Sequence, residues 1–157
     1  MELSFFLNKL QVIQNEFRLD HKNRIVTSKN IIRLGNLSWN IGTLCAFNYP
    51  YSSPQNFITY HNIHVVTKNT LPLVDKLLFS SFDKTCNQIT LYMNTIDTYL
   101  VSHAPLGITK SFFIDLLLSH EIFHFLQCNK YCVLFKTSCL NEIAAYAFTK
   151  NIYNLSL

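Results

Sequence analysis

The feature that most constrains the fold is a long, largely apolar stretch late in the chain, residues 108–127. Its apolar side chains recur every three or four residues, as on one side of an α-helix, and do not alternate as in a strand. They are Phe112, Phe113, Leu116, Leu117, Phe123 and Leu126. Thr109 or Ser111 can cap the start of this helix, because a hydroxyl oxygen accepts a hydrogen bond from a free backbone N–H of the first turn.

The chain is large enough to supply a core for that helix. Its 157 residues suit one domain, 49% of them are hydrophobic and only 14% are charged. This composition argues against disorder. The sequence contains no internal repeat, no low-complexity tract and no clear linker, so we predict a single domain over residues 1–157.

Helical and strand-like patterns occur in turn along the chain, which predicts an α+β fold. Residues 2–17 have the spacing of an amphipathic helix, whereas β-branched and aromatic residues favour short antiparallel strands at 24–27, 31–39 and 41–48. Residues 48–54 contain two prolines and form a loop. Beyond them we predict a strand over 57–68, a helix over 71–82, a strand or bent pair of strands over 88–101, a turn at 104–107 and a last helix over 139–148. The strands should form a small, mostly antiparallel sheet.

Charge and hydropathy argue against several classes of partner. The formal charge is +4, and the densest basic segment, residues 18–24, contains Asp20 as well and is typical of a solvated loop, so we expect no nucleic-acid partner. The apolar segment 112–118 is interrupted by Asp115 and is far shorter than the roughly 20 residues of a membrane span. The first residues do not resemble a secretory signal, which predicts a cytoplasmic location or export by a signal-less route.

The apolar helix carries one polar motif, which runs from His120 through Glu121 to His124. At about 100° per residue, the two histidines lie roughly 40° apart on one face and one turn apart along the axis. Both imidazoles can therefore reach one metal ion. Glu121 points beside that ion, where its carboxylate could take a proton from metal-bound water. This is the His-Glu-x-x-His pattern of zinc metallopeptidases.

A catalytic zinc ion usually takes three protein ligands, so a third is required. Glu142 is the candidate, because it falls in the first turn of the helix predicted over 139–148. Residues 125–141 are enough to end one helix, turn and begin an antiparallel helix across the metal. We therefore predict that His120, His124 and Glu142 bind Zn²⁺.

Two other interpretations of these residues remain open. The histidines could be hydrogen-bonded groups of an ordinary core helix. A structural zinc site could instead combine them with nearby cysteines, namely Cys128, Cys132 and Cys139. Ligands at every fourth position of one continuous helix would extend over about 18 Å, too far for a single ion, so that site needs a break after Gln127. Otherwise the cysteines pack as small buried thiols, and their odd total of five favours reduced thiols.

The second helix carries a resemblance to a known family. The Asn141-Glu142 pair and the Glu-x-x-Ala-x-x-Phe pattern over Glu142, Ala145 and Phe148 resemble the glutamate helix of gluzincins, a branch of the zincin metallopeptidases. Minimal gluzincins and ImmA/IrrE-type regulators are the nearest in size. The resemblance covers residues 88–153.

The resemblance implies a zincin-like fold and a zinc-dependent endopeptidase acting on a protein or peptide substrate, with Glu121 activating zinc-bound water. It also implies that an edge strand before the active-site helix, here residues 88–101, binds the substrate backbone in extended form. A catalytically weak or inactive metal-binding or regulatory module is the alternative, since Tyr146 stands where some gluzincins have an aspartate.

One catalytic role stays unassigned at this point. A donor is needed to stabilise the oxyanion of the tetrahedral intermediate, and in zincins it is often a tyrosine or a histidine. The candidates are His103, Tyr131, Tyr146 and Tyr153.

Overall fold

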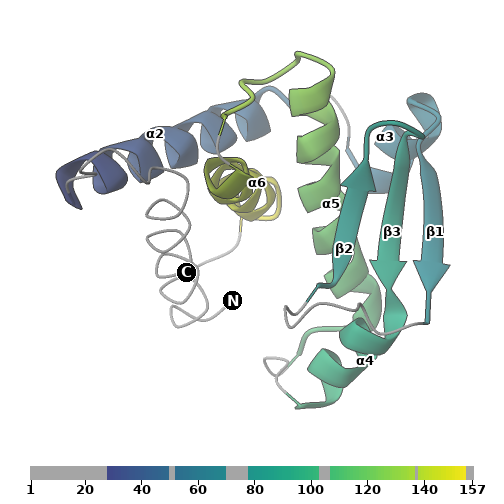
Figure 1. The fold of residues 1–157 in the computed structure, drawn as a ribbon. Helices are drawn as coiled ribbons and strands as arrows, with labels where there is room; N and C mark the ends of the chain where they lie inside the picture. Colours follow the sequence, from purple (N-terminus) through teal and green to yellow (C-terminus); the bar gives the residue numbers. More distant parts are fainter. Residues whose placement is uncertain (1–27, 50–51, 70–77, 103–106, 137, 155–157) are drawn as a thin grey trace. The chain divides into compact units, whose positions relative to one another are not determined.

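The computed structural model describes residues 28–49, 52–69, 78–102, 107–136 and 138–154 (Figure 1). These residues form five α-helices and one three-stranded sheet, so the predicted α+β class is confirmed. They group into two compact units: unit 1 comprises residues 1–49 and 132–157, and unit 2 comprises residues 50–131. Unit 2 is therefore inserted into unit 1 along the chain. The single domain over residues 1–157 stays a prediction.

Unit 2 contains the sheet, which has the strand order β1-β3-β2. Strand β1 (His64–Lys68) pairs parallel with β3 (Gln88–Tyr92), and β2 (Ser80–Asp83) pairs antiparallel with β3 on its other side (Figure 1). The sheet is thus mixed, and the mostly antiparallel sheet predicted from the sequence is wrong. The interior of β3 is buried on both faces, as expected of a central strand.

A tight turn joins β2 to β3. One carboxylate oxygen of Asp83 accepts hydrogen bonds from the backbone N–H and the hydroxyl of Thr85, at 2.8 and 2.6 Å. Such Asx turns reverse the chain locally. The helix predicted over 71–82 is therefore wrong at its end, where residues 80–82 belong to β2, while residues 71–77 lie outside the described part of the chain.

Two short helices of unit 2 correct further strand predictions. Helix α3 (Pro54–Tyr60) begins where the hydroxyl of Ser53 accepts from the N–H of Asn56, with Pro54 in the first turn, so the strand predicted over 57–68 holds only from His64. Helix α4 (Met93–Ser102) replaces the second half of the strand predicted over 88–101. Its Tyr99 stacks on Phe113, with ring centroids 5.3 Å apart. Packing overrides a weak β propensity here.

Helix α5 (Lys110–Cys128) is the apolar helix predicted from the sequence, and Thr109 is its cap, accepting from the N–H of Phe112 at 3.2 Å. Aromatic rings fix it at both ends. Near its start, Phe113 packs edge-on against Phe79 at 5.4 Å, and near its end Phe125 packs against Phe57 and Phe82 at 5.5 and 6.0 Å. These contacts determine which turns of α5 face the sheet.

The described residues of unit 1 contain two packed helices, α2 (Ser28–Phe47) and α6 (Ser138–Ile152). The strands predicted at 31–39 and 41–48 are wrong, because both segments except Asn48 lie in α2. The physical reason is the spacing of small residues: Gly35, Ser38 and Gly42 recur at intervals of three and four, which lines one face of a helix. These small residues admit a neighbouring helix.

That close approach is tightest at Gly42. A Cβ atom added there would lie 2.0 Å from the carbonyl oxygen of Ala144 in α6, so only glycine fits. The hydroxyl of buried Ser38 donates to the carbonyl of Leu140, and Asn151 donates to the hydroxyl of Thr43 at 3.1 Å. Polar groups on the facing surfaces are therefore paired, as burial requires.

The start of α6 is held by a reciprocal pair of hydrogen bonds. The side chain of Asn141 accepts from the N–H of Phe135 at 2.9 Å and donates to its carbonyl at 3.0 Å. The predicted helix over 139–148 is confirmed, but it begins at Ser138, so Glu142 follows the first turn and does not lie within it.

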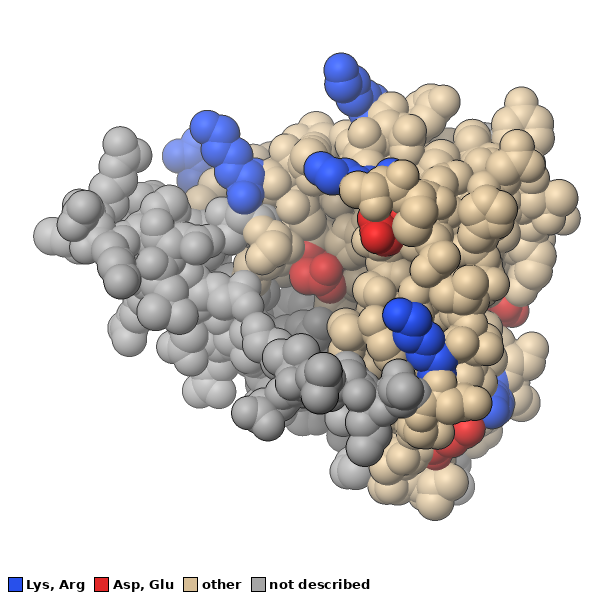
Figure 2. All heavy atoms as spheres, turned by 45° about the vertical axis from the view of Figure 1, so that its right-hand side comes forward, with Lys and Arg blue, Asp and Glu red and all other residues tan. Residues whose placement is uncertain are grey.

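Several sequence predictions lie outside the described residues: the helix at 2–17, the strand at 24–27, the basic segment 18–24 and all but Gly107 of the turn at 104–107. Among the described helices, none is both long and apolar enough to cross a membrane. Figure 2 shows that, on the face drawn, the described charged side chains are scattered over a largely uncharged surface.

We predict opposite effects for two glycine substitutions in α2. Gly42→Ala should destabilise the protein by at least about 3 kcal/mol, because the new methyl group collides with backbone. Gly35→Ala meets its nearest atom, in Ile143, at 3.9 Å, and should stabilise by up to about 1 kcal/mol, since alanine is the better helix former. Urea unfolding measures both, and equal effects would contradict the close approach at Gly42.

Candidate metal centre

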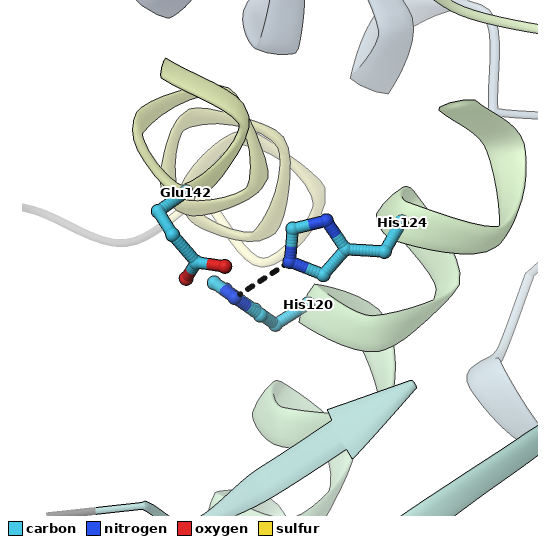
Figure 3. A group of neighbouring side chains, drawn as sticks. All are labelled: His120, His124 and Glu142. Atoms are coloured by element: carbon cyan, nitrogen blue, oxygen red, sulfur yellow. Dashed lines mark hydrogen bonds between the residues drawn. The ribbon is translucent and has the colours of Figure 1, made fainter. Parts of the chain in front are cut away.

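The two motif histidines face each other on α5. The Nε2 atoms of His120 and His124 lie 3.3 Å apart, the contact drawn as a dashed line in Figure 3. Two nitrogens bonded to a tetrahedral zinc ion at about 2.0–2.1 Å stand about 3.3 Å apart. The same spacing permits a hydrogen bond when one ring carries the proton, so the pair alone fits both a metal site and a hydrogen-bonded core pair.

Gln127 favours the metal-binding form of His124. Its side-chain oxygen lies 3.3 Å from Nδ1 of His124, three residues earlier on the same helix, and Gln127 is buried. That amide oxygen accepts a hydrogen bond from Nδ1–H, and in this tautomer Nε2 carries the lone pair that can bind a metal ion. Metal-binding imidazoles in proteins are held in this way by a hydrogen bond at the other nitrogen.

Glu121 follows His120 directly on α5 and is only 4% exposed. Its Oε1 accepts a hydrogen bond of 2.6 Å from the hydroxyl of Ser80, the first residue of β2. A buried carboxylate is costly unless it is hydrogen-bonded, and Ser80 supplies that partner. The sequence offered no local signal for Ser80, which is 41 residues away and lies in a segment predicted as helix.

Glu142 lies on α6, in unit 1. His120, His124 and Glu142 each offer one ligand atom suited to a metal ion, two of them from α5 and one from α6 (Figure 3). Two imidazoles and a carboxylate are donors that suit zinc and several other divalent metals. The imidazole pair is fixed by one helix of unit 2, whereas the carboxylate comes from the other unit. We therefore treat Glu142 as a proposed ligand.

The cysteines predicted as alternative ligands have other surroundings. Cys128 is exposed at the end of α5, and Cys139 is buried in the cluster with Leu140 and Ile143. Within the described ranges, no group of three or more potential ligands includes a cysteine. The rival His/Cys zinc site therefore has no support from these residues.

Cys132 makes a contact that the sequence did not predict. Cys45, in the last turn of α2, donates its thiol proton to the Cys132 sulfur. This hydrogen bond, with burial, raises the pKa of Cys45 far above its usual range. The same bond lowers the pKa of Cys132 from 9.0 to about 7. Cys132 is thus the described thiol best suited to react at neutral pH.

The candidates for the oxyanion donor are dispersed. Tyr131 is exposed just after α5, with its ring 6.4 Å from that of His61. Tyr146 lies on α6, Tyr153 follows α6, and His103 is outside the described residues. The role therefore stays unassigned.

Comparison with models of known protein families, with curated proteins and with solved structures gives no match for this chain. The functional inference therefore depends on the geometry of the site itself.

We predict that Gln127→Met weakens zinc binding by about 10- to 100-fold, because the apolar side chain no longer holds the Nδ1 proton of His124. Competition with a zinc-binding dye measures the affinity. Cys128→Ser is the matched control on the same helix and should leave affinity unchanged. A loss in the Cys128 variant would favour the His/Cys site.

We also predict that Cys132 is alkylated by iodoacetamide with a half-maximal rate near pH 7. Its depressed pKa makes the thiolate predominate above that pH and disappear below it. Cys45→Ala removes the hydrogen-bond donor and should lower the rate at pH 7 by roughly 10-fold or more, as the pKa returns toward its ordinary value. Peptide mass spectrometry reads each site separately, with exposed Cys86 as the internal reference.

Proposed function

We propose that the protein is a zinc-dependent endopeptidase of the gluzincin type. The observation that carries the proposal is the imidazole pair on α5, with Nε2 atoms at the spacing of two zinc ligands, beside a buried glutamate. The residue types follow the His-Glu-x-x-His pattern, and each has a geometry suited to its role. A hydrogen-bonded core pair would account for the histidines but not for a buried carboxylate next to them.

His120, His124 and Glu142 would hold the metal. When bound, zinc supplies a Lewis acid that polarises the scissile carbonyl and makes water acidic enough to attack near neutral pH. Glu121 takes a proton from the attacking water and gives it to the leaving amine. Its burial suits this work, because a carboxylate partly shielded from water acts more strongly on a nearby proton.

The proposed substrate strand differs from the one expected from the sequence. Residues 88–101 cannot serve as an edge strand, because β3 lies between β1 and β2 and the remainder is helical. In the described sheet, β2 is the edge strand alongside α5, as Figure 1 shows. We assign the extended substrate to the outer edge of β2 in the described sheet, next to Ser80 and Glu121. The zincin-like fold is part of the same proposal.

The second candidate is a metal-binding or regulatory module with little or no catalysis. Tyr146, four residues after Glu142, favours it, because some gluzincins have an aspartate there that supports a histidine ligand. A tyrosine cannot supply that negative charge at neutral pH. Metal binding would survive this change while turnover declined.

The proposal predicts that Glu121→Gln abolishes cleavage and retains zinc. The amide keeps the shape of the side chain but cannot accept a proton. Zinc is measured by elemental mass spectrometry, and cleavage by mass spectrometry of casein and of a peptide library. Asp115→Asn, an acid-to-amide change elsewhere on α5, is the matched control and should leave both unchanged.

The dependence of cleavage on zinc is a second test of the proposed peptidase function. Chelation should stop cleavage and added zinc should restore it. Loss of a hydrogen bond that supports a metal ligand lowers metal affinity about 10- to 100-fold. Glu142→Gln changes a proposed ligand itself and should therefore lower zinc affinity by more than that. A zinc-bound wild type that cleaves nothing would favour the binding module, and a wild type without affinity for zinc would refute both candidates.

A further inference from the structure

The contact between Ser80 and Glu121 extends the proposed function to a residue outside the motif. The two side chains are 8% and 4% exposed, and their oxygens are 2.6 Å apart. This is the range of a hydroxyl donating to an ionised carboxylate, one of the stronger hydrogen bonds in proteins. The position of Ser80 is also fixed, because its Cα pairs with that of Leu91 in the antiparallel register of β2 and β3.

The two oxygens of Glu121 have different surroundings. Oε1 accepts from Ser80, and no partner of Oε2 is found among the described residues. Among the described residues, every fully buried side-chain oxygen or nitrogen has a hydrogen-bond partner. Because none is found for Oε2, this atom keeps some contact with solvent. One oxygen is thus anchored to the sheet, and the other has no such anchor among the described residues.

We propose that Ser80 is a positioning residue for Glu121, holding Oε1 so that Oε2 handles the transferred proton. This inference rests on the proposed peptidase function. A glutamate side chain rotates about three bonds, and a general base must be held within hydrogen-bond reach of the proton it takes. Because Oε1 already accepts from the hydroxyl, a proton taken up by Glu121 is directed to Oε2. The same hydroxyl serves both protonation states.

A purely structural role for Ser80 makes different predictions. If the hydroxyl only satisfies a buried carboxylate, its loss should lower stability and leave the turnover of folded protein unchanged. If it positions the base, its loss should lower kcat with KM and zinc content unchanged. Successive side chains of a strand point to opposite faces, so Ser81 is a matched neighbour with the same hydroxyl on the other face of β2.

The first test uses cleavage of casein or of a library peptide by the zinc-loaded protein. Ser80→Ala should lower kcat roughly 10- to 100-fold, the size of effect expected when a catalytic group is misplaced by about 1 Å. Ser80→Thr, which keeps the hydroxyl, should recover most of the loss, and Ser81→Ala should show none.

The second test does not depend on activity. In metal-free protein, urea unfolding of Ser80→Ala, Glu121→Gln and the double variant should be non-additive, whereas Ser81→Ala and Glu121→Gln should add. If Ser80→Ala does not fold, Ser80→Cys is used in its place. Its thiol is of similar size but a weaker hydrogen-bond donor, so the same results are expected.

The outcomes separate the two proposals. If the wild type cleaves and Ser80→Ala has an unchanged kcat, the positioning role is refuted and the proposed peptidase function still holds. Loss of zinc in Ser80→Ala, or additive unfolding energies, also overturns it. A zinc-bound wild type that cleaves nothing overturns the peptidase, and the positioning role with it, even where unfolding shows the contact to exist.

Discussion

The pitch of one helix is the constraint on which the candidate site depends. Positions four apart on an α-helix face the same way one turn apart, and on α5 this brings two imidazole nitrogens to 3.3 Å. The rest of unit 2 keeps that helix in place. Phe113 and Phe125 fix its two ends against neighbouring rings, and Ser80 joins Glu121 to the sheet. The imidazole pair and Glu121 are therefore held by regular elements of a single unit.

The sequence predicted best where the signal is local. The extent of α5, its Thr109 cap and the pairing of His120 with His124 all follow from spacings of three and four, and the structure has them. Gln127 could have been found in the same way, since it lies three residues after His124. Ser80 could not, because strand pairing, and no pattern near Glu121, brings it to the carboxylate. The role of Glu142 as a ligand stays a prediction.

The errors in the fold have one physical origin. Helix α2 and helix α4 are rich in β-branched and aromatic residues, which favour strands when taken alone. Contacts with residues distant in sequence make these segments helical: Gly42 of α2 lies against Ala144, and Tyr99 of α4 stacks on Phe113. A parallel pair such as β1 and β3 is likewise invisible to periodicity, because the pattern within each strand does not record its partner's direction.

The insertion of unit 2 into unit 1 has a consequence for biosynthesis. Ser38 and Leu140, which are hydrogen-bonded, are 102 residues apart, and all of unit 2 is translated between them. Unit 2 is contiguous, so it can fold on the ribosome while α2 still awaits its partner. The glycine-lined face of α2 is then open to chaperones or to other nascent chains until α6 emerges. Completion of unit 1 thus depends on contacts of large sequence separation, which can form only after α6 has been translated.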